Sequence, residues 1–331
     1  MSQAPVIEVN SLTKTYRTYK KKPGLSGALR GLFHREYEEL SAAKDVTFKV
    51  EEGEFVGFLG PTGAGKTTTL KMLAGLLYPT TGTARVLGYT PWQRKDGYRR
   101  QFSLLLGQKN QLWWDLPARE SLDLNGKIYG LEPVAMQKRV EELSELLLVR
   151  EKLNVMVREL SLGERMKMEL IAALLHDPKV LFLDEPTIGL DVVSQKIVRD
   201  FLKAHNQKRR TTILLTSHYM ADIQELCQRV IIIDKGTIFF DGKLSEVLDR
   251  FADSKMVTIH TSPETVVDPA WASPFGEIIE QSSGVIKIKV AREKVSAACK
   301  ALLDTLPVTD IDIQEVPIED IIRRLFSESR A

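Results

Sequence analysis

The clearest chemical pattern in the chain is a phosphate-binding loop. Residues 60–67 read Gly-Pro-Thr-Gly-Ala-Gly-Lys-Thr, between an apolar run at residues 55–59 and a helical stretch that begins near Thr68. Glycines let successive N–H groups point into one concavity, and the following helix adds the positive end of its dipole. In such a loop Lys66 reaches the β- and γ-phosphates, while the hydroxyl of Thr67 ligates magnesium. A glycine-rich turn without a ligand would leave the lysine unexplained, so we expect a bound nucleoside triphosphate with Mg²⁺. The residues expected to contact the nucleotide here are Gly60, Pro61, Thr62, Gly63, Ala64, Gly65, Lys66, Thr67 and Thr68.

Two carboxylates follow a second apolar run. Residues 180–185 read Val-Leu-Phe-Leu-Asp-Glu, which is typical of a buried parallel strand with acids at its carboxyl end. Open α/β sheets bind their ligands at that edge. Asp184 is expected to orient magnesium through its water shell, and Glu185 to polarise a water for attack on the γ-phosphate. The alternative is a solvated strand end.

These residues carry a family resemblance. Residues 160–164, Leu-Ser-Leu-Gly-Glu, lie before the carboxylate strand and resemble the signature of ATP-binding-cassette proteins. The resemblance spans most of residues 6–242. Its other elements follow in the family's order: Tyr16, Gln108, Ile188-Gly189-Leu190-Asp191 and Ser217-His218.

The resemblance implies a role for each element. It places the ring of Tyr16, at the end of the first strand, against adenine, where stacking suits a base that is not read by hydrogen bonds. It implies that Gln108 touches magnesium and the attacking water and links the core to a helical subdomain. It makes His218 a switch residue that contacts the γ-phosphate. Taken alone, Tyr16 reads as a surface aromatic and His218 as a structural histidine.

The signature implies a paired assembly. In the family, Ser161, Gly163 and Glu164 face a nucleotide that is held by another subunit. One chain carries one loop and one signature, so two copies would meet head to tail, with Asp191 crossing the interface. Leu162 stands where the family has a glycine, and Glu164 where it has glutamine. Since Glu185 is present, both sites are expected to hydrolyse ATP.

Composition fits a protein of a reducing compartment. The formal net charge of +2 gives no reason to expect nucleic-acid binding. Cys227 and Cys299 are far apart in the sequence and indicate neither a disulfide framework nor a zinc site. No apolar stretch is long enough to cross a bilayer, and the polar start lacks a secretory segment. Composition therefore favours a cytoplasmic protein, and the family resemblance implies that it is peripheral at the cytoplasmic face of the inner membrane.

The chain is expected to fold as two domains. Residues 1–245 alternate strand and helix patterns, which predicts an α/β fold with a mostly parallel sheet. The resemblance makes this the cassette's phosphate-loop ATPase core, with a helical subdomain at about residues 108–158. Residues 246–331 are expected to form a small α+β domain for dimer contact or regulation, or only for packing. Its predicted elements are strands at residues 285–290 and 311–313 and helices at residues 292–303 and 318–326.

A basic segment between Lys14 and Arg35 contains no Asp or Glu. Its apolar residues have helical spacing, and an amphipathic helix of this kind can rest on anionic lipid. The alternative is a solvated loop. We treat residues 17–41 as an insertion that contacts lipid. The apolar residues are Leu25, Leu29, Leu32 and Phe33.

Two adjacent tryptophans follow Gln108. Trp113 and Trp114 lie where cassettes form the groove for a permease's coupling helix, and large aromatics are favoured anchors in such grooves. We expect one ring in the core and the other in the groove; the alternative is that both are buried. This stretch, together with the basic insertion, resembles the viologen-exporter-like branch of cassettes, whose six-helix permeases are separate chains.

The function that follows is ATP-driven dimer closure that powers a separately encoded permease pair, most simply in an exporter. Chromosome-maintenance cassettes carry a long coiled coil before the signature, and no sustained heptads occur here. Translation-type soluble cassettes have two cassettes per chain. The remaining alternatives are the ATPase of a polysaccharide or lipid exporter, whose extra domain is an all-β sandwich, and a soluble non-transport protein.

Overall fold

The computed structural model divides into two compact units, residues 1–242 and residues 243–331. Each has its own hydrophobic core. The residues that the structure describes are 4–19, 37–107, 111–217, 219–251, 253–265, 267, 272–316 and 320–322.

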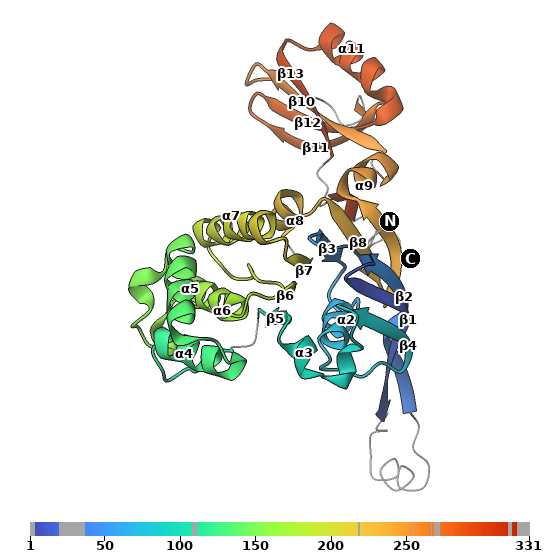
Figure 1. The fold of residues 1–331 in the computed structure, drawn as a ribbon. Helices are drawn as coiled ribbons and strands as arrows, with labels where there is room; N and C mark the ends of the chain where they lie inside the picture. The colour runs from blue at the N-terminus through green and yellow to red at the C-terminus, as the bar shows by residue number, and fades with distance from the viewer. Residues whose placement is uncertain are drawn as a thin grey trace, which may run out of the picture. The chain divides into compact units, whose positions relative to one another are not determined.

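The first unit is built around a six-stranded sheet in the order β5-β6-β7-β3-β8-β9 (Figure 1). Five of these strands, β5, β6, β7, β3 and β8, pair in parallel. Every residue of β3 and β7 is buried, because helices cover both faces of such a sheet. The predicted apolar runs are therefore strands, and the predicted α/β fold class is confirmed. The strands are β3 (Phe55–Leu59), β5 (Phe102–Leu106), β6 (Val180–Asp184), β7 (Thr212–Thr216), β8 (Arg229–Asp234) and β9 (Thr237–Lys243).

A second, antiparallel sheet has the order β2-β1-β4. Alternate residues of β2 point into the core, where Val46, Phe48 and Val50 are buried. Its strands are β1 (Ile7–Tyr19), β2 (Tyr37–Val50) and β4 (Thr81–Val86).

Strand β1 continues beyond the point that the sequence predicted. Tyr16 pairs with Leu40, and the ladder runs on to the pair Tyr19 and Tyr37, so the prediction that Tyr16 ends the first strand is wrong. An ion pair of 2.7 Å from Arg17 to Glu39 joins the two strands within this extension. Residues 17–19 and 37–41 of the predicted insertion are therefore strand. Residues 20–36 lie outside the described part, so the helix and its lipid contact stay predictions.

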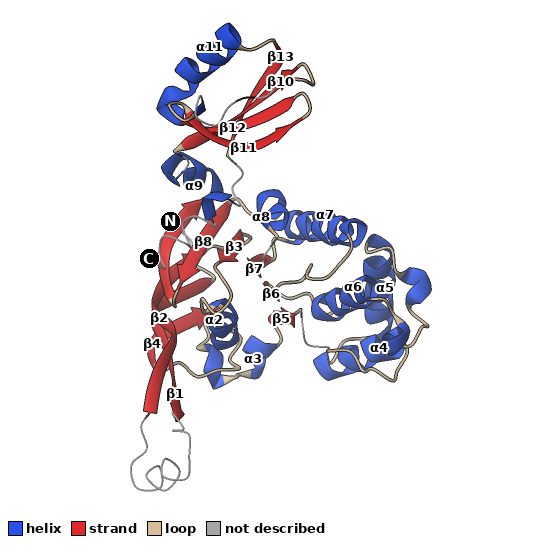
Figure 2. Ribbon diagram, turned by 180° about the vertical axis from the view of Figure 1, so that it is seen from behind, coloured by secondary structure: helices blue, strands red, loops and turns tan. Residues whose placement is uncertain are grey.

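The helices of the first unit fall into two groups. Helix α2 lies between the two sheets, whereas α4, α5 and α6 gather beside β5 (Figures 1 and 2). The helices expected after Gln108 are present as α4 and α5. The bounds are α2 (Lys66–Leu73), α3 (Asp96–Arg99), α4 (Ala118–Tyr129), α5 (Pro133–Leu146), α6 (Leu162–Leu174), α7 (Val192–Arg209) and α8 (Met220–Leu226), with 3-10 turns η1 (Pro91–Gln93), η2 (Arg150–Lys152) and η3 (Val157–Glu159).

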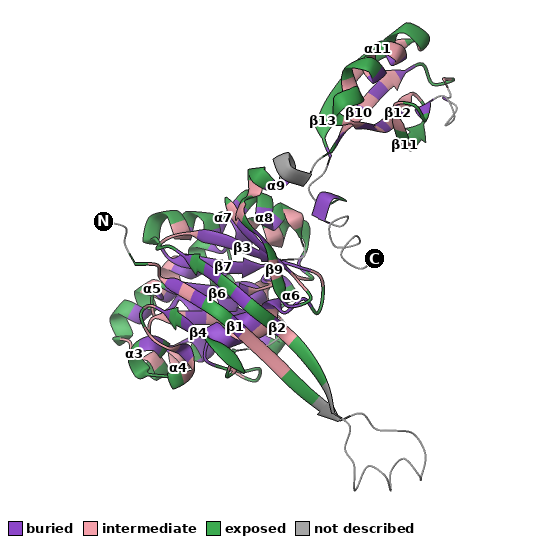
Figure 3. Cartoon of the chain, turned by 90° about the vertical axis from the view of Figure 1, so that its right-hand side faces the viewer, coloured by how far each residue is buried: buried purple, intermediate pink, exposed green. Residues whose placement is uncertain are grey.

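The core of the first unit joins α2 to both sheets. Leu70, Met72 and Leu73 of α2 are fully buried, in one cluster with Phe58 of the parallel sheet and Val86 of the antiparallel sheet. Figure 3 shows the buried parallel strands at the centre of this unit. Since the phosphate loop lies between β3 and α2, this packing anchors both of its ends.

The second unit is an antiparallel sheet in the order β11-β12-β10-β13. Ile286, Ile288 and Val290 alternate inward on β12 and pack with Ala298 and Leu302 of α11. The two predicted strands correspond to β12 and β13, whereas β10 and β11 were missed. The helix predicted near residue 292 is present as η4 and α11, and the one at residues 318–326 lies mostly outside the described part. The bounds are α9 (Leu244–Phe251), β10 (Ser254–Thr261), β11 (Gly276–Ser282), β12 (Val285–Ala291), η4 (Arg292–Lys294), α11 (Val295–Thr305) and β13 (Val308–Glu315).

The tryptophan pair is not in the core. Trp113 and Trp114 are 38% and 43% exposed, so both the prediction of one buried ring and the alternative of two are wrong. Leu112 takes the buried position before them. The backbone N–H of Trp113 donates to Ser121 Oγ at 2.8 Å, which holds this residue in place. The guanidinium of Arg165 lies 5.1 Å from the ring centroid of Trp114, an arrangement that favours an exposed ring.

Within the described residues, none of the helices is long and apolar enough to span a bilayer. The same residues contain no group of three or more His, Cys, Asp or Glu side chains that could hold a metal ion.

Candidate active site

The phosphate loop leaves β3 and enters α2 with a backbone that only glycine accepts at two points. Gly65, the residue before α2, has φ 105°, and a Cβ atom there would lie 2.1 Å from the carbonyl oxygen of Ala42. A Cβ atom on Gly60 would lie 2.3 Å from the carbonyl oxygen of Ile233. Helix α2 therefore begins at Lys66, directly after this tight turn, with its N-terminus at the loop.

Lys66 is buried beneath the loop. Its ammonium donates to the carbonyl oxygens of Gly60 at 2.6 Å and Pro61 at 3.1 Å. Burial lowers the pKa of Lys66, while the negative charges of Glu185 and Asp184 act in the opposite direction. The lysine thus lies at the loop, within electrostatic reach of both predicted carboxylates.

The structure brings Thr67 and Asp184 together from far apart in the sequence. The hydroxyl of Thr67 donates to Asp184 Oδ2 at 2.8 Å, and the hydroxyl of Thr216 donates to Asp184 Oδ1 at 2.7 Å. A hydroxyl and a carboxylate are hard oxygen ligands of the kind that Mg²⁺ takes, together with water and phosphate oxygens. The side chains at this point therefore fit the magnesium ion that the sequence predicts.

Glu185 follows β6 in a left-handed backbone conformation, with φ 57°. Such a conformation costs a non-glycine residue about 1–2 kcal/mol, so neighbouring contacts must hold it. Its N–H donates to the carbonyl oxygen of Thr216 at 3.0 Å. On its other side lies Gly107, where a Cβ atom would be 2.5 Å from the carbonyl oxygen of Glu185. The turn therefore sets the direction of the glutamate.

The signature begins helix α6 with a capping box. Ser161 Oγ accepts from the N–H of Glu164 at 3.2 Å, and Glu164 Oε2 accepts from the N–H of Ser161 at 2.9 Å. The hydrogen bond from the Ser161 N–H is the main cause that lowers the pKa of Glu164. The ammonium of Lys152, 3.1 Å from Glu164 Oε1, lowers it further. The carboxylate that replaces the family's glutamine is thus bound within its own chain. A Cβ atom on Gly163 would lie 2.7 Å from Ser194 Oγ, so this glycine lets α6 approach the start of α7.

Comparison with known proteins agrees with this site. A profile of the ABC transporter family matches residues 43–188, and one of the C-terminal domain of EvrA-like ABC transporters matches residues 253–314. The ABC transporter ATP-binding protein NatA of Bacillus subtilis is 36% identical over 217 residues, which is 66% of this chain and 88% of NatA. The chain belongs to the ATP-binding-cassette family of transporter ATPases. The predicted family is therefore confirmed, and with it ATP binding and hydrolysis as the activity of the cassette.

Two further relatives of the cassette inform its use. Nod factor export ATP-binding protein I of Ralstonia nicotianae is 33% identical over 251 residues, or 75% of this chain and 76% of that protein. A bacterial ABC transporter cassette solved as a dimer is 25% identical with a TM-score of 0.61, and the similarity covers 72% of this chain and 98% of that one.

Two predicted site residues of the cassette, Gln108 and His218, lie outside the described residues, so their roles stay predictions. Tyr16 is 36% exposed on β1, with the ammonium of Lys14 5.3 Å from its ring centroid. Asp191 begins α7 as its N-cap and accepts from the N–H of Ser194 at 2.9 Å.

Sequence reasoning missed a buried ionic network behind the site. Asp222 of α8 is fully buried and accepts from the hydroxyls of Thr187 and Ser217 and from the guanidinium of Arg199. Thr187 follows Glu185 by two residues and Ser217 directly precedes His218, so one carboxylate joins the segment after the predicted catalytic glutamate to the segment before the predicted switch. In the sequence, the signal that could have pointed to this network was an acidic residue four positions after His218.

Glu169 of α6 is a second missed residue. The residue is 3% exposed, and its carboxylate accepts from the backbone N–H groups of Gln111 and Leu112 at 2.9–3.3 Å. It thereby fixes the described residues that follow Gln108 to the helix of the signature. Burial raises the pKa of Glu169 to about 6, although these backbone N–H groups act against the shift.

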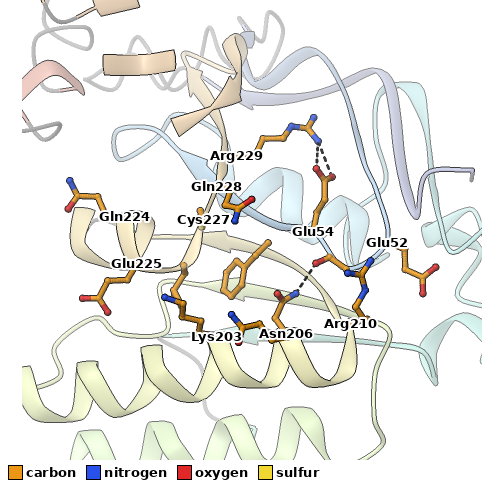
Figure 4. Close-up of a pocket in the computed structure, with 14 residues that line it drawn as sticks. Glu52, Glu54, Lys203, Asn206, Arg210, Gln224, Glu225, Cys227, Gln228 and Arg229 are labelled. Carbon is orange, nitrogen blue, oxygen red and sulfur yellow. Dashed lines mark hydrogen bonds and ion pairs between the residues drawn. The ribbon is translucent and has the colours of Figure 1, made fainter. Parts of the chain in front are cut away.

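The polar pocket in Figure 4 lies at the other end of the sheet from this site. Its lining includes Phe55, the first residue of β3, whereas the phosphate loop follows Leu59, the last. Arg229 there bonds both Glu54 and Asp241, at 3.0 Å and 2.8 Å. These ion pairs join β8 to β9 and to the turn before β3, which is a structural role.

Proposed function

We propose that this chain is the ATP-hydrolysing subunit of a membrane exporter, working as a head-to-tail homodimer on a separate pair of permease subunits at the cytoplasmic face of the membrane. One observation carries the proposal. The chain holds one phosphate loop joined to Asp184, which Glu185 follows directly, and one signature whose serine is exposed on the surface of the same unit. Each nucleotide then needs the signature of a second copy.

The roles proposed for the described residues follow from their positions. Lys66 binds the β- and γ-phosphates, since its ammonium is held at the loop by the carbonyl oxygens of Gly60 and Pro61. Thr67 ligates magnesium, and Asp184 holds that hydroxyl in place. Bound Mg²⁺ would neutralise charge on the phosphates. Glu185 polarises the attacking water, and its constrained backbone aims the side chain.

The pairing is supported by the signature's surface. Ser161 is exposed and Leu162 is 40% exposed at the start of α6, where backbone N–H groups favour an anion. Asp191 lies next to them, because Gly163 contacts Ser194 of the same turn as Asp191. A related cassette was solved as a dimer. We infer that Asp191 contacts the second copy at this surface.

A permease helix has a candidate docking place. A cavity of about 380 Å³ lies beside α4, with Leu76 53% exposed at its edge. Apolar pockets with a few polar groups suit a buried helix anchor. The exposed tryptophans are not among the described lining residues, which include Leu76, Phe102, Leu104, Leu106, Gln111 and Tyr129.

The second unit distinguishes export of polysaccharide from other cargo. A polysaccharide-exporting ATPase is expected to carry an all-β sandwich, whereas the described residues of this unit form one sheet covered by α11. Export itself is supported by the name of the Nod factor relative. We therefore favour a viologen-exporter-like system over a polysaccharide exporter.

Glu185→Gln tests the proposed engine. If the carboxylate is the base, the variant keeps ATP binding but loses about 10²-fold or more in turnover, because the amide cannot take the proton. It should then elute as a dimer with ATP and Mg²⁺ and as a monomer with ADP. Phosphate release and size-exclusion chromatography measure the two effects.

Lys66→Ala is the control, since it should lose nucleotide binding and dimer together. Turnover in Glu185→Gln equal to that of the wild type would remove the glutamate from its proposed role. An ATP-bound variant that stays monomeric would exclude the paired engine.

A further inference from the structure

A second cavity, of about 380 Å³, lies between α5 and α7, away from the phosphate loop (Figure 1). Half of its lining residues are apolar, and the other half are charged or polar. Pockets of this size and character bind small molecules when a few polar groups converge on them. The apolar lining residues are Leu143, Leu146, Leu148, Ile197, Phe201 and Ala204.

Three cations at the cavity share two carboxylates. Arg139 bonds Glu142 at 3.5 Å and Asp177 at 3.2 Å. Lys208 lies 3.6 Å from the same Glu142, and Arg209 lies 3.7 Å from the same Asp177. This cluster therefore has one positive charge in excess.

The remaining polar groups do not cancel that charge. Asp200 lines the cavity but pairs with Lys196 at 3.0 Å on the next turn of α7. His205 is buried, and burial lowers its pKa to about 4, so it is neutral at pH 7.

Arg139 also has a donor without an acceptor. Its side chain is only 11% exposed, and within the described residues its Nε has no hydrogen-bond partner. A buried unsatisfied donor costs about 1–3 kcal/mol, more for a charged group. Because this atom is buried, a ligand in the cavity would interact with the charge of the guanidinium and not with the Nε–H.

We propose that this cavity binds a carboxylic acid with an aliphatic body, its carboxylate pairing with the cation cluster of Arg139, Lys208 and Arg209 and its chain packing on the leucines between α5 and α7. One carboxylate balances the single excess charge. A neutral alcohol would leave that charge in place, and a phosphate dianion would exceed it.

Binding is tested on the full-length, nucleotide-free protein by isothermal titration calorimetry with decanoate. Two probes separate the parts of the ligand: 1-decanol has the chain without the charge, and butyrate has the charge with little chain. We expect decanoate to bind at least about tenfold more tightly than either, equivalent to 1.4 kcal/mol. Equal affinity for 1-decanol would overturn the carboxylate assignment, and equal affinity for butyrate the aliphatic one.

Two tryptophan variants locate the site. Ala204→Trp fills the cavity from an exposed position of α7 and should weaken decanoate binding at least about tenfold. Ala297→Trp, at an exposed position of α11 in the other unit, should bind as the wild type does. Unchanged affinity in Ala204→Trp would overturn the proposal. The readout needs neither ATP nor a dimer, so it is independent of the proposed transport function.

Discussion

At the scale of single residues, the site depends on carboxylates whose partners set their behaviour. Asp184 accepts from two hydroxyls and is a ready partner for a metal-bound threonine. Glu169 is different, because burial raises its pKa to about 6 from an ordinary 4.5. A raised pKa means that the folded chain holds the proton more tightly than the unfolded chain does. The contribution of Glu169 to the free energy of unfolding therefore falls as pH rises from about 4.5 to about 6.

Glu169→Gln makes this visible. The amide keeps an acceptor for the N–H of Gln111 but never ionises. Raising the pH from 4.5 to 7.5 should therefore lower the free energy of unfolding of the wild type, relative to that of the variant, by about 2 kcal/mol. Urea unfolding at the two pH values measures it. Glu145→Gln, at an exposed position of α5, controls for the loss of a charge. A difference that does not vary with pH would show that Glu169 does not titrate in this range.

At the scale of elements, one buried carboxylate ties α7, α8 and the two strand ends of the site together. Asp222 is fully buried, whereas Glu225, the other partner of Arg199, has a side chain 45% exposed. Removing the buried partner leaves the buried guanidinium of Arg199 with only the half-exposed Glu225 to compensate its charge. The exposed partner is screened by water.

We therefore expect Asp222→Asn to cost about 3–5 kcal/mol in the free energy of unfolding, and Glu225→Gln no more than about 1 kcal/mol. Chemical denaturation compares the two. Asp222→Asn should also lower ATPase turnover more than Glu225→Gln does, because the amide offers one acceptor oxygen where the carboxylate uses two for Thr187, Ser217 and Arg199. Equal stability losses in the two variants would contradict the network.

At the scale of the whole molecule, the proposed pairing makes each site composite. Lys66→Ala destroys the loop and keeps the signature, and Ser161→Arg does the reverse, so either homodimer should be inactive. In a mixed dimer one site keeps an intact loop and an intact signature. An equal mixture should therefore recover roughly a quarter of wild-type turnover, because half of the dimers are mixed and each has one working site. A mixture as inactive as its parts would place both elements in one subunit's site.

The sequence alone determined the phosphate loop, the acid pair, the signature and the parallel strands. Their chemistry depends on neighbouring residues, such as the glycine that precedes α2 and the apolar run before Asp184, and short-range sequence patterns record those constraints directly. Tertiary structure alone decided the extension of β1 past Tyr16, the exposure of both tryptophans, the second hydroxyl on Asp184 and the place of Asp222. These depend on which distant segments meet in space. Cross-strand pairing and packing between helices decide which distant segments are in contact, and the spacing of residues along the chain does not encode those contacts.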